Sequence, residues 1–86
     1  MTHQELWAGI VNLANEMNLT CSGLARVAGL DSTTFNKSKR TNRNGTLRWP
    51  STYSLARVMD AAGIGLKDFA KFMPHDTPNN WRKRNR

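Results

Sequence analysis

The stretch Thr20 to Arg40, TCSGLARVAGLDSTTFNKSKR, limits the possible folds more than any other part of the chain. Thr20 can cap a helix, because its hydroxyl can accept a hydrogen bond from a free N–H of the first turn. Three apolar residues then recur at the i, i+3, i+4 spacing of one helical face, namely Leu24, Val27 and Ala28. Gly29 follows, where the end of a helix favours a residue that tolerates positive φ. The pattern predicts a short helix that ends in a tight turn.

A second short helix is predicted after this turn, over about residues 32–38. Leu30 is expected to be buried, and Asp31 or Ser32 to cap the helix. Phe35 is the expected inward residue, while polar side chains take the outward positions, namely Ser32, Thr33, Asn36, Lys37 and Lys39. Two short helices around a glycine turn, the second of them polar, are typical of a helix-turn-helix, whose second helix lies in the major groove of DNA.

The charge balance also indicates a polyanionic partner. The chain has 86 residues, enough for one small domain. Its 13 Lys and Arg outnumber its 6 Asp and Glu, so the formal net charge is +7. For such a domain the expected polyanion is nucleic acid, and an acidic membrane surface is the competing possibility.

Other classes of protein find little support in the sequence. No apolar run approaches the roughly 20 residues of a spanning helix, and no export signal is recognisable, so we expect a cytoplasmic, nucleoid-associated protein. The single cysteine, Cys21, excludes an internal disulfide, and two scattered histidines form no zinc pattern, so no metal or cofactor is expected. An enzyme is not expected either, because Asp31, Asp60, Asp68 and His75 form no nucleophile–base or paired-carboxylate pattern.

The N-terminal segment predicts a helix over about residues 3–17. Thr2 and Glu5 have the spacing of a capping box. Apolar residues then recur at helical spacing, namely Leu6, Ile10, Leu13 and Met17, with Trp7, Val11 and Ala14 beside them. The Asn18-Leu19 pair is expected to end the helix. His3 is interpreted as an ordinary solvated histidine.

A long basic loop, residues 38–48, follows the second helix of the motif. Its cations are Lys39, Arg40, Arg43 and Arg48, and Asn44-Gly45 is a turn signal. Loops of this length in small domains usually have a function. We expect this one to lie along the phosphate backbone of DNA, and the alternative is a solvated loop without a partner.

Two more helices are predicted in the second half of the chain. Trp49-Pro50-Ser51 opens the first of them, with Pro50 in its first turn and Gly63 and Gly65 at its end. Its expected buried side comprises Tyr53, Leu55, Val58, Met59 and Ala62. The last helix is expected over Leu66 to Met73, before Pro74. Its Phe69, Phe72 and Met73 are interpreted either as core or as a self-complementary dimer surface.

The chain is expected to divide into a DNA-binding domain, residues 1–73, and a basic flexible tail or linker, residues 74–86. The tail carries Trp81 and four cations that can reach DNA, namely Arg82, Lys83, Arg84 and Arg86.

LTCSGLARVAGLDSTTFNKSKR, followed by RWPSTYSLARVMDAAGIGLKDF, resembles the DNA-binding domain of lambda-repressor-like (Cro/repressor, XRE-type) regulators. Within that group the chain is similar to the N-terminal domain of LexA-like and phage-repressor-like bacterial regulators, over about residues 3–73. The resemblance implies an all-α fold, a five-helix lambda-repressor-like domain whose second and third helices form the helix-turn-helix. Many relatives continue into a self-cleaving peptidase-like domain, which these 86 residues do not supply.

The resemblance also implies roles for individual residues. Base contacts fall on Ser32, Thr33, Asn36 and Lys37. Contacts to the DNA backbone fall on Thr20, Cys21 and Ser22 at the start of the first motif helix. The backbone contacts expected of Lys39, Arg40, Arg43 and Arg48 rest instead on the charge and position of the basic loop, which is longer than the tight turn of the simplest members. The chain departs from the family at Cys21 and Gly23, where many members carry Gln and Glu.

The expected function is therefore sequence-specific binding of double-stranded DNA by a transcriptional regulator, a repressor of the phage or stress-response type. It would bind a palindromic operator as a two-fold homodimer. One alternative is a protein-interaction module that uses Phe69, Phe72 and Trp81 to recruit RNA polymerase or a second regulator. Another is an RNA-binding protein, although the chain lacks the aromatic platform expected for unstacked bases.

Overall fold

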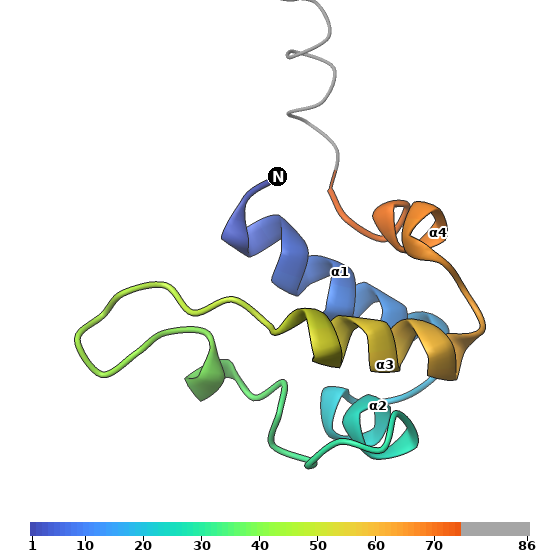
Figure 1. Ribbon diagram of the computed structural model, residues 1–86, viewed down its shortest axis with the longest axis horizontal. Coiled ribbons are helices and arrows are strands. Elements are labelled where there is room, and N and C mark those ends of the chain that lie inside the picture. Colours follow the sequence, from blue (N-terminus) through green and yellow to red (C-terminus); the bar gives the residue numbers. More distant parts are fainter. Residues whose placement is uncertain (75–86) are drawn as a thin grey trace, which may run out of the picture.

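Four α-helices and one short 3₁₀ helix form the regular structure of residues 1–74, the part of the chain that the computed structural model describes. The α-helices are α1 (His3–Glu16), α2 (Cys21–Val27), α3 (Thr52–Ala62) and α4 (Leu66–Ala70), and the 3₁₀ helix is η1 (Lys37–Lys39). Figure 1 shows α1 beside α4, α2 beneath them, and a long excursion of the chain between α2 and α3. The all-α prediction is confirmed, and the predicted five-helix arrangement is not what the structure shows.

The first helix begins and ends as its sequence predicts. The Glu5 N–H donates to Thr2 Oγ1 (3.1 Å), and the Thr2 N–H donates to Glu5 Oε1 (2.7 Å), which completes the capping box. At the other end Asn18 takes a left-handed conformation, with φ of 58°. The Leu19 N–H then reaches back to the Ala14 carbonyl (2.8 Å) and closes the helix.

The second helix also follows prediction at both ends. The Gly23 N–H donates to the Thr20 hydroxyl (3.0 Å), so Thr20 is the N-cap. Gly29 has φ of 77°, and the Leu30 N–H donates to the Ala25 carbonyl (2.8 Å). Arg57 of α3 adds a contact that the sequence did not indicate, because its Nε–H donates to the Ala28 carbonyl (2.8 Å). A cation thus satisfies a carbonyl at the C-terminal end of α2, where the helix dipole favours positive charge.

The core lies where α1 packs against α2 and α4, with α3 packed on α2. Its buried apolar residues are Leu6, Trp7, Ile10, Leu13, Ala14, Leu24, Ala25, Ala28, Phe35, Val58 and Phe69. Phe35 enters this core although it stands in irregular chain, so the segment after α2 is fixed to the body by one aromatic side chain. No helix among the described residues combines the length and apolarity needed to cross a membrane.

Some buried helical faces and some helix ends differ from those predicted. Val27 is 56% exposed and Tyr53 is 66% exposed, so neither belongs to the core. Ala25 takes the buried position on α2 instead of Val27. The helix α3 begins at Thr52 with Ser51 as its N-cap, so Pro50 precedes the helix rather than lying in its first turn. The last helix ends at Ala70, and turns replace its predicted final residues.

The helix predicted over residues 32–38 is absent, and a turn followed by η1 takes its place. Asn36 between them is extended, with ψ of 151°. The residues Asp31 to Thr34 explain this difference. Short polar side chains form hydrogen bonds to nearby backbone groups that compete with a helical ladder, and threonine is a poor helix former. A segment of about seven residues has too few internal hydrogen bonds to overcome that competition alone.

Candidate nucleic-acid interface

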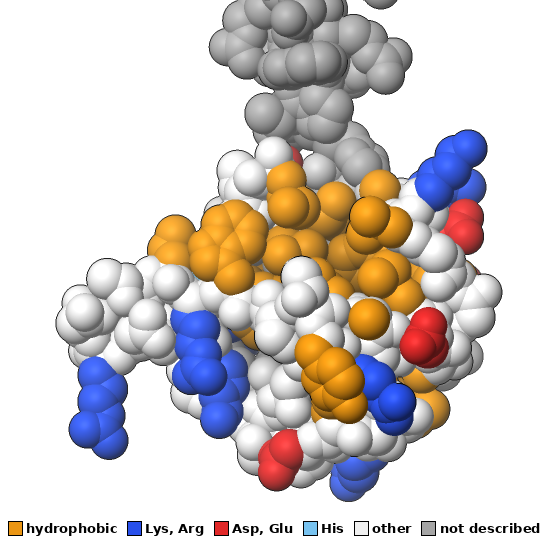
Figure 2. Space-filling model, in the orientation of Figure 1, with side chains coloured by type: hydrophobic (Ala, Val, Ile, Leu, Met, Phe, Trp, Pro, Cys, Tyr) orange, Lys and Arg blue, Asp and Glu red, His pale blue; other side chains and the backbone are white. Residues whose placement is uncertain are grey.

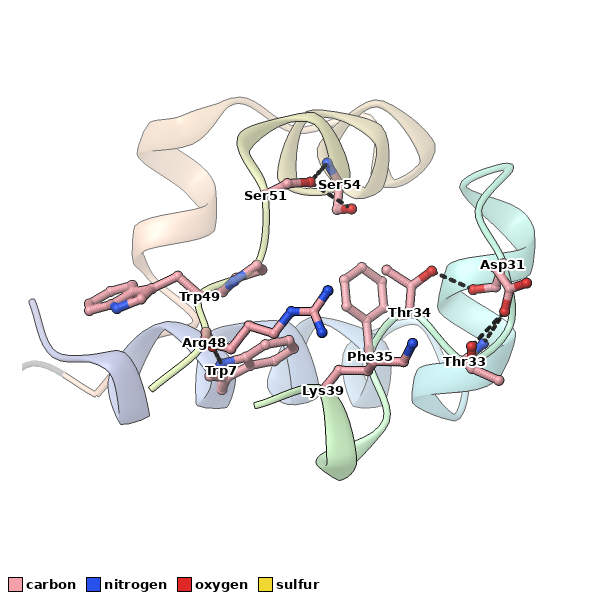
Figure 3. A pocket seen from close by; sticks show the side chains of 11 residues that line it. Trp7, Asp31, Thr33, Thr34, Phe35, Lys39, Arg48, Trp49, Ser51 and Ser54 are labelled. Atoms are coloured by element: carbon pink, nitrogen blue, oxygen red, sulfur yellow. Dashed lines mark hydrogen bonds between the residues drawn. The ribbon is translucent and has the colours of Figure 1, made fainter. Parts of the chain in front are cut away.

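The turn that follows α2 is organised by Asp31. Asp31 Oδ1 accepts hydrogen bonds from the Thr33 hydroxyl (2.6 Å) and the Thr33 N–H (2.9 Å), as Figure 3 shows. The Thr34 hydroxyl and N–H both donate to the Asp31 carbonyl (2.6 and 3.0 Å). Hydrogen bonds from the Thr33 hydroxyl and backbone hold the pKa of the Asp31 carboxyl below its ordinary value of 3.8. The sequence predicts that Asp31 or Ser32 caps a helix here, but Asp31 closes a turn instead, because the helix is absent.

The four predicted base-contacting residues occupy this turn and the start of η1. Ser32 is half-buried, and the Thr33 hydroxyl is committed to Asp31. Asn36 and Lys37 are exposed, and the Asn36 side chain makes no capping hydrogen bond to η1. Of the four, Asn36 and Lys37 therefore present the most accessible hydrogen-bonding groups.

The predicted basic loop is a hairpin. In this basic hairpin (residues 40–48), the Arg48 N–H donates to the Arg40 carbonyl (2.9 Å), and an antiparallel bridge joins Thr41 to Leu47. The turn at its tip forms where Asn44-Gly45 predicts one, and Asn44 Oδ1 accepts from the Thr46 hydroxyl (2.8 Å). Figure 1 shows the hairpin projecting from the helical body.

Cations line the basic hairpin from its base to its tip. Arg43 and Arg48 are exposed, whereas Arg40 is half-buried with its guanidinium carbon 5.1 Å from the centre of the Trp7 ring. The chain between Ser32 and Met59 holds no Asp or Glu, and its cations are Lys37, Lys39, Arg40, Arg43, Arg48 and Arg57. Figure 2 shows Lys and Arg side chains protruding along the lower edge of the hairpin region. This part of the surface therefore carries an excess of positive charge, although the Asp31 carboxylate lies near Lys39.

A cavity of about 420 Å³ opens between the turn, the hairpin base and the start of α3. Its lining comprises Trp7, Asp31, Thr33, Thr34, Phe35, Lys39, Arg48, Trp49, Pro50, Ser51 and Ser54. The cationic ends of Lys39 and Arg48 both lie within this region in Figure 3. Ser51, the N-cap of α3, accepts from the Ser54 N–H (3.0 Å) at the opposite wall. Two cations beside a helix N-terminus favour an anionic group in this cavity, and the Asp31 carboxylate in the same lining offsets part of that positive charge.

The start of α2, where DNA-backbone contacts are predicted, has one hydroxyl already used within the helix and two half-buried side chains. Thr20 is exposed, but its hydroxyl already caps the helix. Cys21 and Ser22 are half-buried, and the Cys21 thiol is free. Within residues 1–74, no group of three or more potential ligand side chains is placed to hold a metal ion.

The predicted dimer residues lie mainly in the core. Phe69 is 2% exposed, and Phe72 and Met73 are partly buried against the core. An apolar groove of about 300 Å³ lies beside them, between α1, α3 and α4, and Figure 2 shows this face as a broad apolar area. Its lining comprises Met1, Leu6, Leu55, Met59, Leu66, Phe69, Ala70 and Met73. The tail residues Trp81, Arg82, Lys83, Arg84 and Arg86 lie outside the described residues.

One residue near this interface differs from its sequence interpretation. His3 is half-buried rather than solvated, and its ring nitrogen contacts backbone carbonyls of the basic hairpin. The capping box at Thr2 fixes the helical position of His3, but the sequence holds no signal for a partner about 40 residues away.

Comparison with protein-family models, with curated proteins and with solved structures finds no match to the chain.

Proposed function

We propose that the protein is a transcriptional regulator that binds specific sequences of double-stranded DNA, a repressor related to the lambda-repressor-like regulators. The observation that carries the proposal is the run of six cations without a carboxylate between Ser32 and Met59. Most of that run forms a projecting hairpin and the cation-lined cavity beside it. Such a surface fits the regular phosphate spacing of a nucleic acid.

The affinity would come from phosphate contacts of Lys39, Arg43 and Arg48. The first and last lie at the cavity, and Arg43 lies near the hairpin tip. Each contact releases counterions from DNA, so the affinity should fall steeply as salt rises. Arg40 would contribute mainly by stabilising the hairpin base, because its guanidinium lies over Trp7.

The sequence preference would come from the turn and η1, which would enter the major groove in place of a regular helix. Asn36 and Lys37 are the exposed residues there, with Ser32 and Thr33 beside them. An Asn amide can pair with the major-groove edge of adenine, and Lys can donate to guanine.

The operator would be palindromic and would bind a two-fold homodimer. The proposed contact between the two copies is the apolar groove between α1, α3 and α4, where Leu66 is 71% exposed and Met1 is 69% exposed. Two copies on one face of DNA place their half-sites about 34–36 Å apart, or at multiples of that distance.

Selection of bound sites from random duplex DNA tests the proposed function. A palindromic consensus with half-sites about one helical turn apart is expected. A protein that retains DNA without enriching any sequence would contradict specific regulation. Competition between the selected duplex and an RNA duplex of the same length separates this function from RNA binding.

The exposed apolar groove also fits a second function, recruitment of RNA polymerase or another regulator. In that case Leu66→Gln should abolish capture of the partner and leave duplex binding per protomer unchanged. Loss of dimers and of cooperative DNA binding in the same variant would assign the groove to the homodimer.

A further inference from the structure

The basic hairpin is attached to α1 through His3. The imidazole Nε2 lies 2.8 Å from the Arg48 carbonyl oxygen and 3.0 Å from the Arg40 carbonyl oxygen. These carbonyls belong to the two arms of the hairpin at its base, where the Arg48 N–H donates to the Arg40 carbonyl. A carbonyl oxygen can only accept, so His3 donates to the hairpin base in the tautomer that carries its hydrogen on Nε2.

Trp7, one turn further along α1, completes this attachment. Its Nε1 lies 3.1 Å from the Arg48 carbonyl oxygen and 3.0 Å from His3 Nε2. The indole N–H donates to the Arg48 carbonyl, and in the tautomer with a bare Nε2 it also donates to His3. The Trp7 ring is 3% exposed and packs edge-on against Phe35, with ring centres 6.3 Å apart. The hairpin base is therefore bonded to a residue of the core.

His3 also makes an aromatic contact with Trp49, the residue that follows the hairpin. The His3 ring meets the Trp49 ring edge-on, with centres 5.5 Å apart and an angle of 84°. The Trp49 side chain is 47% exposed. His3 thus contacts the first residue of the hairpin, its last residue and the residue after the last, although it stands at the start of the chain.

The rest of the hairpin has no comparable attachment. Residues 41–48 are all exposed, and their hydrogen bonds lie within the hairpin itself, apart from those that the Arg48 carbonyl accepts from His3 and Trp7. An isolated two-stranded hairpin is marginally stable in water. The direction in which Arg43 projects is consequently set at the base, by the contacts of His3 and Trp7.

We propose that His3 is a positioning residue for nucleic-acid binding, which fixes the basic hairpin on α1 so that Arg43 and Arg48 meet the phosphates in one geometry. This inference rests on the proposed function. Its physical basis is preorganisation, because a segment that must be ordered during binding lowers the affinity.

Three substitutions in the full chain test the inference, with one matched control. His3→Ala removes the donor, His3→Asn shortens its reach, and His3→Gln keeps an amide N–H at a reach similar to that of Nε2. Gln4→Ala is the control, since Gln4 is the exposed neighbour in the same helical turn. All four leave the capping box of Thr2 and Glu5 in place.

The first measurement is hydrogen exchange of the free protein. In His3→Ala and His3→Asn the amides of Asn42 and Arg48 should exchange at least about tenfold faster, because the local opening of the hairpin becomes easier. Core amides of α1 and α3 should be unchanged, which also shows that the variants fold. His3→Gln and Gln4→Ala should resemble the wild type.

The second measurement is the affinity for duplex DNA as a function of salt. His3→Ala and His3→Asn should bind about three- to tenfold more weakly, because part of the binding free energy must then order the hairpin. The slope of log K against log salt is negative, and its magnitude should decrease by about 0.9 for each phosphate that the variant no longer neutralises. Rescue of both quantities by His3→Gln would support positioning through the N–H donor rather than through ring packing.

The possible outcomes separate this inference from the proposed function. If the hairpin amides of His3→Ala exchange hydrogen as slowly as those of the wild type, the inference is overturned, whatever the DNA affinity. Faster exchange with unchanged affinity and salt slope also overturns it, because binding then does not require a fixed hairpin. If the wild type binds no duplex DNA, the proposed function fails, whereas the exchange result still decides whether His3 fixes the hairpin.

Discussion

Among single residues, Gly29 is the one whose backbone and surroundings both exclude a side chain. Its φ of 77° is unfavourable for other residues, and a methyl group there would collide with the Arg57 guanidinium. That guanidinium is held by the hydrogen bond from Arg57 Nε to the Ala28 carbonyl. The hydrogen bond from Arg57 therefore joins the end of α2 to α3, and Gly29 leaves room for the Arg57 guanidinium.

Gly29→Ala and Gly63→Ala should lower the free energy of unfolding by different amounts. Gly63 also ends a helix with positive φ, but a methyl group there meets open space. Gly63→Ala should lower the free energy of unfolding by about 1–2 kcal/mol, the cost of the left-handed conformation. Gly29→Ala should cost about 1 kcal/mol more, because displacing Arg57 also breaks a hydrogen bond. Urea denaturation measures both, and equal losses would contradict the role of Arg57.

Asn36 should be a sequence-reading residue. It is exposed, and its side chain does not cap η1, so its amide is available to a base edge. Asn36→Ala should cost about 1–3 kcal/mol on the selected operator and little on random duplex DNA. Fluorescence anisotropy with both duplexes measures the difference. Equal losses on the two duplexes would exclude base reading by this residue.

Single residues also show what the sequence can predict. Thr2, Thr20 and Gly29 act through hydrogen bonds and dihedral angles within a few residues, so the predictions of their caps and helix ends are confirmed. The predictions for His3 and Tyr53 are wrong, because their environments depend on distant chain. The exposure of Tyr53 is set by where α3 lies on α2, and helical periodicity alone does not determine that.

Among elements, the turn and η1 lie where the sequence predicts the candidate site, but the predicted helix over residues 32–38 is absent there. The prediction that Phe35 points inward is confirmed, whereas Asp31, predicted with Ser32 as a helix cap, closes a turn instead. The sequence therefore locates the candidate site, although it does not predict its backbone. Asp and Thr side chains in this run form hydrogen bonds with nearby backbone groups. A run of Asp, Ser and Thr is therefore the sequence signal that a turn competes with a helix there.

The stability of the turn should depend on pH. Since the folded-state pKa of Asp31 lies below 3.8, its charged form contributes stability above the unfolded pKa. That contribution is lost as the pH falls through the folded pKa. An NMR titration should show the Thr33 amide resonance shifting together with the Asp31 carboxyl below pH 3.8. In Asp31→Ala the Thr33 amide should lose this transition.

The basic hairpin should act on all DNA sequences alike. Arg43 is exposed near its tip, where it can reach a phosphate, and the hairpin carries it away from the helical body. Arg43→Ala should weaken binding to the operator and to random duplex by the same factor, and reduce the salt slope by about 0.9. Lys67→Ala on α4 is the matched control, since it removes one exposed cation outside the proposed interface. A loss confined to the operator would instead assign base reading to Arg43.

For the whole molecule, charge and apolar surface lie on different parts of the fold. The cations of residues 37–48 surround the hairpin and the cavity, whereas the apolar groove lies between α1, α3 and α4. Figure 2 shows the broad apolar area on the helical body and cations at its lower left. The proposed DNA interface and the proposed dimer contact are therefore separate surfaces of one small domain.

Within residues 1–74, the projecting hairpin should be the first site of proteolysis in the free protein. Trypsin cleaves after Arg and Lys, and exposed turns are cut before helices. The first cleavage within residues 1–74 should follow Arg43, leaving α1 and α2 on one fragment and α3 and α4 on the other. Mass spectrometry identifies the cut, and a first cut within α2 or α3, after Arg26 or Arg57, would contradict the fold.

The two fragments should stay together after this cleavage. Ile10 and Leu24 belong to one fragment, Val58 and Phe69 to the other, and all four are buried in the same core. The nicked protein should elute as one species in native buffer and as two in urea. Bound operator should slow the cut at Arg43, so that digestion with and without DNA maps the interface at a single peptide bond.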